Sequence, residues 1–459
     1  MTSRASRRVD WTRALAGAIA HLQALIRIDT VNPPGNELGA AQYLDAVLRR
    51  AKIKTIRFEP APGRGALVAR LQGNGRARPL LLLAHMDVVG VERDRWTQRP
   101  FGGDIVDGCV YGRGAIDDKG MLACNLQTML LLQKHVVDAG DELSRDVIFV
   151  ATGDEETGGA YGIDWLAQHH REVLDAEWAL NEGGRVRIVD GRVLYAAVQC
   201  AEKVPHAVIV RATGTSGHAA VPLPDNPIAR LARAVAAIAT HREPLHLTDV
   251  SRGFFGELAP VWPHANEARA MADIASDDPR RVEAGDEVLS RVPGYDAVLR
   301  NGISPTMLSG GSRTNVIPGE ATAILNVRTM PGDPIEALLG RLRTLITEPG
   351  VELRVRGSGV DAPATPIRTA MFDAIRESVQ ELEPDLRVVP YLSTGATDSA
   401  ALRRLGIKAY GLLPFPLTQE DEGRMHGHDE RVPVSSLGFG IRAVYGIVRR
   451  MTGPPPDIC

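Results

Sequence analysis

The chain has 459 residues, of which 44% are hydrophobic and 24% charged, and this composition is typical of a soluble globular protein with two or more domains. Its formal net charge of −3 gives no strong basic field, so we expect neither a nucleic acid nor a membrane as a partner. The four cysteines provide no disulfide framework and no Cys-x-x-Cys pair, which argues against a thiolate zinc site.

The first predicted element is an amphipathic helix near the N-terminus. Its apolar residues recur at helical spacing (Leu15, Ile19, Leu22, Leu25 and Ile26). Charged or polar residues (Asp10, Arg13, His21 and Arg27) interrupt the apolar core that an export signal needs. We therefore expect a surface helix and a cytoplasmic protein.

The first two hundred residues alternate buried strands with helices. Leu80–Ala84 and Val147–Ala151 are short continuous apolar runs, as strands covered on both faces require, and Glu177–Leu180 is a third candidate. A helix is predicted over Met121–His135 between the first two strands. This β-α-β order predicts an α/β domain with a largely parallel sheet.

The pattern changes near residue 205. Asn226 and Pro227 have the residue types of a helix start, and Asp333-Pro334 opens a second helix. Four strands are predicted around these helices: His206–Arg211, Thr306–Leu308, Glu320–Arg328 and Val351–Arg356. The resulting order β-α-β-β-α-β is ferredoxin-like, and it encloses a long polar insertion, residues 242–300, to which the sequence assigns no structure.

From Pro366 the sequence again has the pattern of the first two hundred residues. An amphipathic segment covers Ile367–Leu382, and a short apolar strand is predicted over Lys408–Leu413. The simplest organisation is one α/β domain, residues 1–204 and 361–459, interrupted by an inserted α+β domain, residues 205–360.

Histidines and carboxylates follow the buried strands. His85-Met86-Asp87 follows the first strand, Asp154-Glu155-Glu156 the second, and Asn181-Glu182 the third. Two further groups are Asp117-Asp118-Lys119, in a Gly-rich turn before a helix, and the segment His426–Arg431. Since sites in open α/β sheets form beyond the carboxyl ends of the strands, we expect these groups to converge there.

Two histidines with several carboxylates suit Zn²⁺ or a similar divalent ion, and a carboxylate can bridge two such ions. Of the adjacent pair Glu155-Glu156, one can coordinate while the other handles protons as a general base. Each piece also has a plain structural interpretation: Asp117-Asp118 as a helix cap, Glu155-Glu156 as a solvated face, and the His428 region as an exposed loop. The joint pattern favours the metal site.

These segments resemble the metallopeptidases and amidohydrolases that include aminoacylase, carboxypeptidase S, carboxypeptidase G and succinyl-diaminopimelate desuccinylase. The resemblance spans nearly the whole chain, is nearest to the carboxypeptidase S branch, and also rests on His218, with Gly217 and Ala219, and on Asn315–Glu320. It implies a zinc-exopeptidase-like three-layer catalytic domain interrupted by a ferredoxin-like lid.

The resemblance implies a role for each matching position in a site of two Zn²⁺ ions, or of Co²⁺ or Mn²⁺. His85 and Glu182 would hold one ion, Glu156 and His426 the other, and Asp117 would bridge them. Asp87 would orient His85, and Glu155 would be the general base. His426 is preferred to His428 because the family's ligand stands four residues before the Glu of this motif. A cis peptide bond between Asp117 and Asp118 is also implied.

In the lid, His218 would stabilise the oxyanion and, in dimeric members of the family, reach the active site of the partner. Asn315 and Arg328 would contact a substrate carboxylate, which a guanidinium matches bidentately. A solvent-facing strand residue is the alternative interpretation of Arg328. Gly395 and Thr397 would complete the substrate pocket. We therefore expect a homodimer that pairs through the lids.

The expected function is metal-dependent hydrolysis of an amide bond next to a free carboxylate, in N-acyl amino acids or short peptides. A dipeptidase and an ArgE-type deacetylase have the same chemistry and remain open. An alternative from another class is a catalytically silent scaffold that only binds a metal or ligand. The presence of Glu155 argues against the scaffold, because a silent protein has no need of the base.

Overall fold

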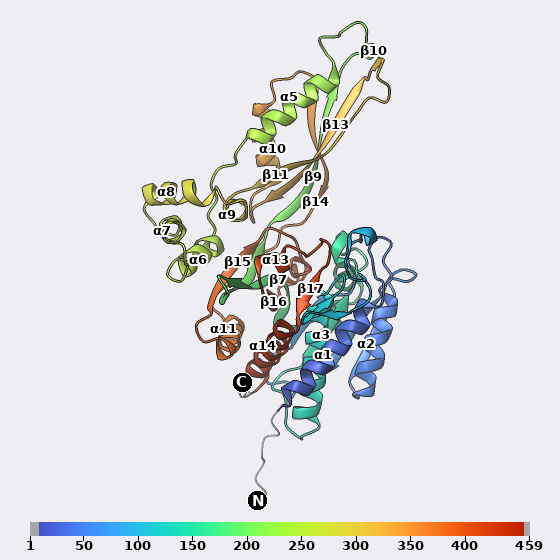
Figure 1. Ribbon diagram of the computed structural model, residues 1–459, viewed down its shortest axis with the longest axis vertical. Helices are drawn as coiled ribbons and strands as arrows, with labels where there is room; N and C mark the ends of the chain where they lie inside the picture. The colour runs from blue at the N-terminus through green and yellow to red at the C-terminus, as the bar shows by residue number, and fades with distance from the viewer. Residues whose placement is uncertain (1–8, 454–459) are drawn as a thin grey trace, which may run out of the picture. The chain divides into compact units, whose positions relative to one another are not determined.

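A computed structural model describes residues 9–453 of the chain, which divide into two compact units (Figure 1). The large domain comprises residues up to Cys200, Thr365–Tyr391 and residues from Thr397 onward. The inserted domain, which corresponds to the predicted lid, comprises Ala201–Ala364 and the short segment Leu392–Ala396. The sequence analysis predicted that the inserted domain comprises residues 205–360, so both domain boundaries lie within four residues of the prediction. It did not predict that the segment Leu392–Ala396 also belongs to this domain.

An eight-stranded mixed sheet forms the centre of the large domain. Its strand order is β1-β2-β6-β3-β7-β16-β8-β15. β3 runs parallel to β6 and β7, and β16 runs parallel to β7, so the centre of the sheet is parallel as predicted. The strands are β1 (Lys54–Phe58), β2 (Ala66–Leu71), β3 (Leu80–His85), β6 (Val147–Thr152), β7 (Trp178–Val189), β8 (Arg192–Glu202), β15 (Arg387–Ser393) and β16 (Lys408–Leu417).

Helices cover both faces of this sheet. Every residue of β3 and β6 is buried, as their continuous apolar sequences predicted. On one face, Leu81, Leu83 and Ile148 pack with α4 (Ile163–His169) and α12 (Ser399–Arg404). The opposite face carries α1 (Trp11–Ile26), α2 (Leu38–Arg50), α3 (Lys119–Leu132), α11 (Ala370–Leu382) and α14 (Val434–Thr452). The predicted three-layer architecture is confirmed.

The helices of this domain begin and end close to their predicted positions. α1 buries Leu22, Leu25 and Ile26, as its apolar spacing indicated. The helix predicted over Met121–His135 starts at Lys119 and is followed by a π-helical turn, Gln133–Val137. Among residues 9–453, no helix is both long and apolar enough to traverse a bilayer.

The inserted domain has the predicted β-α-β-β-α-β order and a four-stranded antiparallel sheet, β11-β13-β9-β14. Asn226 caps α5 by accepting hydrogen bonds from two backbone N–H groups, which is the predicted helix start. The elements are β9 (Val204–Thr213), α5 (Pro227–Thr240), β11 (Gly302–Gly310), β13 (Glu320–Thr329), α10 (Ile335–Leu345) and β14 (Val351–Ser358). Both helices pack on one face of the sheet around a common apolar core.

The segment 242–300, left unassigned from the sequence, forms four helices of the inserted domain. They are α6 (Asp249–Leu258), α7 (Ala265–Ile274), α8 (Pro279–Leu289) and α9 (Pro293–Asp296). Buried Glu243 ties this segment to the rest of the domain, because its carboxylate pairs with Arg341 of α10.

The first prediction concerns the core of the large domain. Leu83 in β3 is completely buried, so Leu83→Ala leaves a cavity and should lower the free energy of unfolding by about 2–5 kcal/mol. Ile56 lies on edge strand β1 and is 52% exposed, so Ile56→Ala should cost less than about 1 kcal/mol. Denaturant unfolding followed by circular dichroism measures both, and equal losses would contradict this description of the core.

Candidate metal centre

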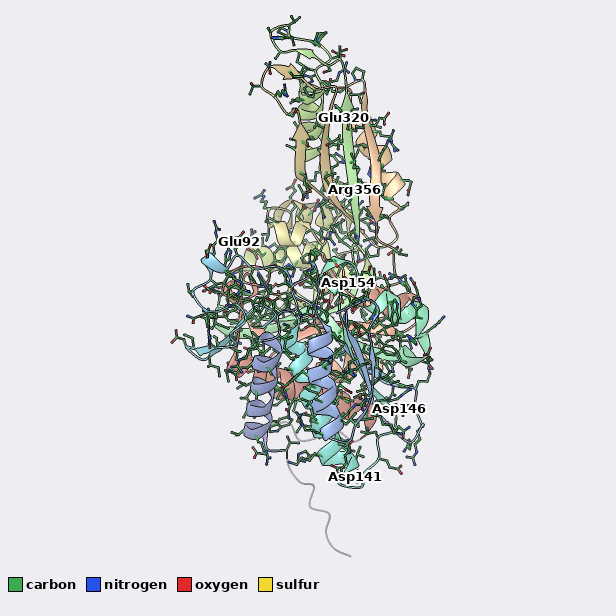
Figure 2. All side chains as sticks on the ribbon, turned by 90° about the vertical axis from the view of Figure 1, so that its right-hand side faces the viewer. Glu92, Asp141, Asp146, Asp154, Glu320 and Arg356 are labelled. Carbon is green, nitrogen blue, oxygen red and sulfur yellow. The ribbon has the colours of Figure 1, made fainter. Side chains whose placement is uncertain are left out.

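The candidate centre lies at the carboxyl edge of the parallel strands. β6 and β7 both pair in register with β3, starting from Leu80, so their carboxyl ends meet at one edge. His85 is the last residue of β3, and Glu155 and Glu156 follow the end of β6. Figure 2 shows this polarity, since Asp146 and Asp154 lie at opposite ends of β6.

Glu182 reaches this edge from within a strand, whereas the sequence analysis placed it after the end of the strand. β7 continues from Trp178 to Val189, whereas the strand was predicted to end at Leu180. Its pairing with β3 does end at Leu180, but pairing with β16 and β8 carries the strand onward. Glu182 therefore stands just beyond the last residue that pairs with β3, and its side chain is buried.

Asp117 stands between the two predicted histidine ligands. His85 Nε2 lies 2.9 Å from Asp117 Oδ1, and His426 Nε2 lies 3.2 Å from Asp117 Oδ2. His426 Nε2 also lies 3.3 Å from Glu156 Oε1. One carboxylate thus offers a different oxygen to each histidine, which is the arrangement that a bridging ligand of two ions requires.

The segments that carry these ligands come from distant parts of the chain. Asp117 is followed by a cis peptide bond to Asp118, as the resemblance implied, and α3 begins at Lys119. His428, the alternative to His426, turns away from the centre and contacts Glu92, with His428 Nε2 3.1 Å from Glu92 Oε2. The geometry therefore brings His426 rather than His428 to Asp117.

Acidic side chains outnumber the histidines in the centre, and this affects the pKa values of its residues. Hydrogen bonds to Asp117 and Glu156 raise the pKa of His426 to about 10. Burial raises the pKa of Glu155 well above its usual range, and the nearby charges of Glu182 and Asp398 raise it further. The neighbouring carboxylates contribute to both shifts, since they stabilise the protonated form of His426 and, in addition to burial, disfavour the ionised form of Glu155.

The donor set fits divalent cations. The ligand atoms of His85, Asp117 and Glu156 lie within 4.8 Å of one another. Glu156 Oε1 is buried, and its contact with His426 Nε2 at 3.3 Å places this oxygen beside the imidazole that would share an ion with it. A bound cation would also supply the missing positive charge and bring the Glu155 carboxyl back toward its ionised form.

Asp87 has a different set of contacts from the one expected. His85 Nδ1 bonds to the backbone oxygen of Asp87 at 2.9 Å, while the nearer carboxylate oxygen of Asp87 lies 3.5 Å away. The carboxylate instead accepts the backbone N–H groups of Glu155 and Glu156. Asp87 therefore orients His85 mainly through its main chain and fixes the Glu155-Glu156 segment through its side chain.

Several residues of this network were missed in the sequence. Asn32 Nδ2 donates to Asp87 Oδ2 at 2.9 Å, to Asp154 Oδ1 at 3.0 Å and to Thr157 Oγ1 at 3.0 Å. Arg64 Nη2 also donates to Asp154 Oδ1, at 2.7 Å. Asp154 has a left-handed backbone, with φ of 68°, directly before Glu155. The sequence signal for Asn32 was its position before Pro33-Pro34, where a fixed turn carries a polar side chain.

The residues predicted in the lid lie at opposite ends of the inserted domain's sheet. His218 pairs with Val316 in the short β10–β12 ladder (Gly217–His218 with Val316–Ile317), next to Asn315, whose backbone oxygen accepts the Ala219 N–H. Figure 1 shows β10 at the tip of this domain, beyond the Glu320 end of β13. Arg328 lies near the other end of β13, where it pairs with Pro205 and Gly302.

Gly395 and Thr397 belong to different domains. Gly395 lies in the short segment Leu392–Ala396, where its N–H donates to Ser393 Oγ. Thr397 belongs to the large domain, and Thr397 Oγ1 accepts the Ser399 N–H at the start of α12. Asp398, the residue after Thr397, is buried and accepts a hydrogen bond from Thr152 Oγ1. Burial raises the pKa of Asp398 to about 7.

Comparison with known proteins identifies related sequences. Residues 81–450 match the sequence profile of peptidase family M20/M25/M40. The chain is 26% identical to the human N-fatty-acyl-amino acid synthase/hydrolase PM20D1, over 81% of this chain and 74% of that protein. It is also 26% identical to probable carboxypeptidase S-like 2 of Dictyostelium discoideum (81% and 71% covered) and to rat aminoacylase-1B (94% of each covered).

Solved structures share the fold. An M20 family metallo-carboxypeptidase from Sulfolobus solfataricus superposes with a TM-score of 0.72 and 19% identity, covering 95% of this chain and 99% of that one. YXEP of Bacillus subtilis, described as a dinuclear metal binding peptidase, superposes with a TM-score of 0.59 and 14% identity, covering 95% and 98%.

A metal titration tests the centre. We expect the metal-free protein to bind two Zn²⁺ ions, and His426→Ala should weaken one of them by at least about 100-fold. His428→Ala is the matched control and should leave both affinities unchanged, since His428 contacts only Glu92 in its ion pair. Competition with a chelator of known affinity measures the two dissociation constants, and two unweakened ions in His426→Ala would contradict the assignment.

The same titration should depend on pH. His426 holds its proton up to a pKa of about 10, and a metal ion takes the same ring nitrogen, so binding must release a proton. The affinity for Zn²⁺ should therefore rise steadily as the pH increases from about 6 to about 8.5. An affinity that stays constant over this range would be inconsistent with a protonated histidine in the metal-free centre.

Proposed function

Because the chain belongs to peptidase family M20/M25/M40 and is a metal-dependent hydrolase of amide bonds, we propose that it cleaves the amide bond next to a free α-carboxylate. The substrates are N-acyl amino acids or short peptides cut at the C-terminal residue. The observation that carries this proposal is the pair of histidines facing the two oxygens of Asp117, with the Glu155 carboxyl in the same charge cluster. The names of the relatives, which include an N-acyl amino acid hydrolase and an aminoacylase, support this substrate class.

We propose two divalent ions, Zn²⁺ or else Co²⁺ or Mn²⁺, in the centre. His85 and Glu182 would hold one ion, Glu156 and His426 would hold the other, and Asp117 would be shared between them. When bound, such ions polarise the substrate carbonyl and lower the pKa of a water molecule toward neutrality. The convergence of the His85, Asp117 and Glu156 ligand atoms, with His426 Nε2 against both carboxylates, supports this ligand set.

Glu155 is the proposed general base. Its carboxylate takes a proton from the attacking water and then gives a proton to the departing amine nitrogen. A base works best when its pKa lies near the operating pH. Burial and the neighbouring carboxylates raise the pKa of Glu155, and bound cations would lower it again.

Asp87 and Asn32 hold this base in place. The Asp87 carboxylate accepts the N–H groups of Glu155 and Glu156, and Asn32 holds that carboxylate from the other side. The base and the adjacent metal ligand therefore share one anchor, which keeps their side chains at a fixed separation.

Four residues of the inserted domain and Thr397 of the large domain recognise the substrate in this proposal. Arg328 and Asn315 contact its free carboxylate, His218 stabilises the oxyanion, and Gly395 and Thr397 line the pocket. The pKa of Arg328 is lowered by burial, but a guanidinium stays protonated at any physiological pH. Arg328 Nε donates to Asn326 Oδ1, which orients the guanidinium on its strand.

The inserted domain's own geometry supports a dimer. Eight residue steps from Glu320 to Arg328 span about 26 Å of β13, and His218 lies beyond the Glu320 end. A carboxylate next to the scissile amide is too close to that bond for one inserted domain to provide both Arg328 and His218. We therefore propose a homodimer in which the partner supplies His218 together with the adjacent Asn315.

A strand edge offers a surface for this pairing. β11 is an edge strand of the sheet and exposes Met307 and Leu308, with 63% and 69% of their surface accessible. Apolar side chains on an unpaired edge favour pairing with a second copy of the same strand. We propose this edge as the dimer surface, and we propose a cytoplasmic location for the enzyme.

Three alternatives stay open. A dipeptidase or an ArgE-type deacetylase would use the same centre with a different substrate preference. A silent scaffold that only binds a metal or ligand is the alternative outside catalysis. The buried network that fixes Glu155 favours catalysis over the scaffold, because metal binding by Glu156 requires no ordered base beside it.

A substrate panel tests the proposed function. The purified protein, loaded with Zn²⁺ or Co²⁺, is assayed on N-acyl amino acids with short and long acyl chains, on dipeptides and on N-acetylornithine. Each N-acyl amino acid is paired with its C-terminal carboxamide, which lacks only the negative charge. We expect kcat/KM to fall at least about 100-fold for the carboxamides, because recognition through Arg328 loses its charge-assisted hydrogen bonds. Equal rates on acids and carboxamides would contradict the proposal.

Replacement of Glu155 tests the base. Glu155→Gln keeps the size of the side chain but removes its ability to take a proton, so turnover should fall about 10²–10⁴-fold with both ions still bound. Glu172→Gln, at an exposed position of the same domain, should keep full activity. Metal analysis accompanies the kinetics, and wild-type turnover in Glu155→Gln would remove this role.

Mixing two inactive variants tests the dimer. If subunits exchange and His218 acts on the partner's site, Glu155→Gln mixed with His218→Ala gives heterodimers with one intact site. Activity should then recover toward about a quarter of the wild-type value, since half of the randomly exchanged dimers have one working site of two. The unmixed variants are the controls, and no recovery despite demonstrated exchange would rule out the role in trans.

A further inference from the structure

Arg113 and Glu430 form a buried ion pair directly behind the metal centre. Arg113 lies in the Gly-rich turn before Asp117, and Glu430 lies four residues after His426. Arg113 is 2% exposed and Glu430 is completely buried, with Arg113 Nη1 2.7 Å from Glu430 Oε2. Neither side chain contacts a metal ligand atom in any of its hydrogen bonds, so the pair has no direct part in the chemistry described above.

The two segments meet through a short strand pair. β17 (Arg431–Pro433) pairs antiparallel with β5 (Cys109–Tyr111), and Arg431 stands opposite Tyr111. The Gly112 N–H then donates to the backbone oxygen of Glu430 at 2.9 Å. This pairing brings the turn that leads to Asp117 alongside the loop that contains His426.

The Glu430 carboxylate determines the course of that turn. Its Oε2 accepts the Gly114 N–H at 3.0 Å in addition to Arg113. Its Oε1 accepts the N–H groups of Ile116 and Asp117, at 2.8 Å and 3.1 Å. The backbone of the proposed bridging ligand is therefore held directly by this carboxylate.

Arg113 holds the other ligand. Its Nη2 donates to the backbone oxygen of Gly427 at 2.8 Å, and its guanidinium lies 5.3 Å from the centre of the Trp96 ring. Gly427 directly follows His426, whose backbone is left-handed with φ of 58°. The side chain of His426 is 53% exposed, so packing around the ring provides little restraint, and the loop has to be fixed through its backbone.

We propose that Arg113 and Glu430 are positioning residues that set the distance between the bridging carboxylate and the His426 imidazole before a metal ion binds. Glu430 fixes the backbone of Asp117, Arg113 fixes the backbone after His426, and their ion pair joins the two. A buried ion pair is weak evidence for stability, because its desolvation cost offsets its attraction. The geometry it imposes on two ligands gives it a function that two apolar side chains would not have.

This inference rests on the proposed two-ion centre, and a metal titration separates the failure of one from the failure of the other. Metal-free parent protein and Arg113→Lys are titrated with Zn²⁺ against a competing chelator. Lysine keeps the positive charge beside Glu430 but lacks the planar fork that reaches Glu430 and Gly427 together. We expect one of the two dissociation constants to rise 10–100-fold while the other changes less than about threefold.

A second substitution acts on the shared ligand. Glu430→Gln removes the charge and places an amide N–H₂ against backbone N–H groups, so both dissociation constants should rise, because Asp117 serves both ions. Arg450→Lys is the matched control. Arg450 is a largely buried arginine of the same domain that pairs with Glu381, away from the ligand segments, and its substitution should leave both constants unchanged.

A double variant distinguishes positioning from general stabilisation. If Arg113 acts through His426, then Arg113→Lys should have no further effect on Zn²⁺ binding once His426 is replaced by Ala. Thermal unfolding of each metal-free variant accompanies the titrations. Affinities in folded Arg113→Lys that all stay within threefold of the parent, or a further loss in the double variant, would overturn the proposal. A parent that binds no Zn²⁺ would reject the two-ion centre itself.

Discussion

The structure depends on one electrostatic constraint, which is the gathering of several carboxylates at the carboxyl edge of a parallel sheet. Asp117, Glu155, Glu156 and Glu182 converge there with only two imidazoles among them. Burial together with the neighbouring carboxylates raises the pKa of the Glu155 carboxyl, and hydrogen bonds to Asp117 and Glu156 raise the pKa of the His426 ring. Such a cluster persists in a folded protein when cations compensate it, and its geometry has to be maintained against mutual repulsion.

Side chains that donate no metal ligand oppose that repulsion from two sides. Asn32 holds Asp87 and Asp154, which flank the base segment, while Arg113 and Glu430 hold the segments of Asp117 and His426. All four contacts join loops rather than strands. Loops lose more conformational freedom when they are fixed, so an ordered site at the edge of a sheet needs such cross-connections.

The two domains contain different sets of candidate functional residues. The large domain contains every residue of the charge cluster, and the inserted domain contains Arg328, Asn315 and His218, the candidates for binding the substrate carboxylate and the oxyanion. Those residues lie at opposite ends of one sheet, with the length of β13 between Arg328 and the ladder of His218. The proposed roles of Arg328 and His218 at one bond therefore require a second subunit, because the length of β13 separates the two residues within one inserted domain.

The sequence by itself determined the strands of the parallel centre and most ligand candidates. Continuous apolar runs such as Leu80–Ala84 have to be buried on both faces, and the polar residues after them then fall at one edge. Helix starts such as Asn226-Pro227 were also readable, because capping is a local interaction. The length of β7 and the contacts that hold the ligand loops became visible only in the tertiary structure. β7 extends through Asn181–Gly184 because β16 and β8 pair with it, and Asn32, Arg113 and Glu430 look like ordinary loop residues until distant segments meet. Contacts such as those of Asn32 with Asp87, 55 positions away, and of Arg113 with Glu430, 317 positions away, leave no periodic signal in the sequence, so only the folded structure reveals them.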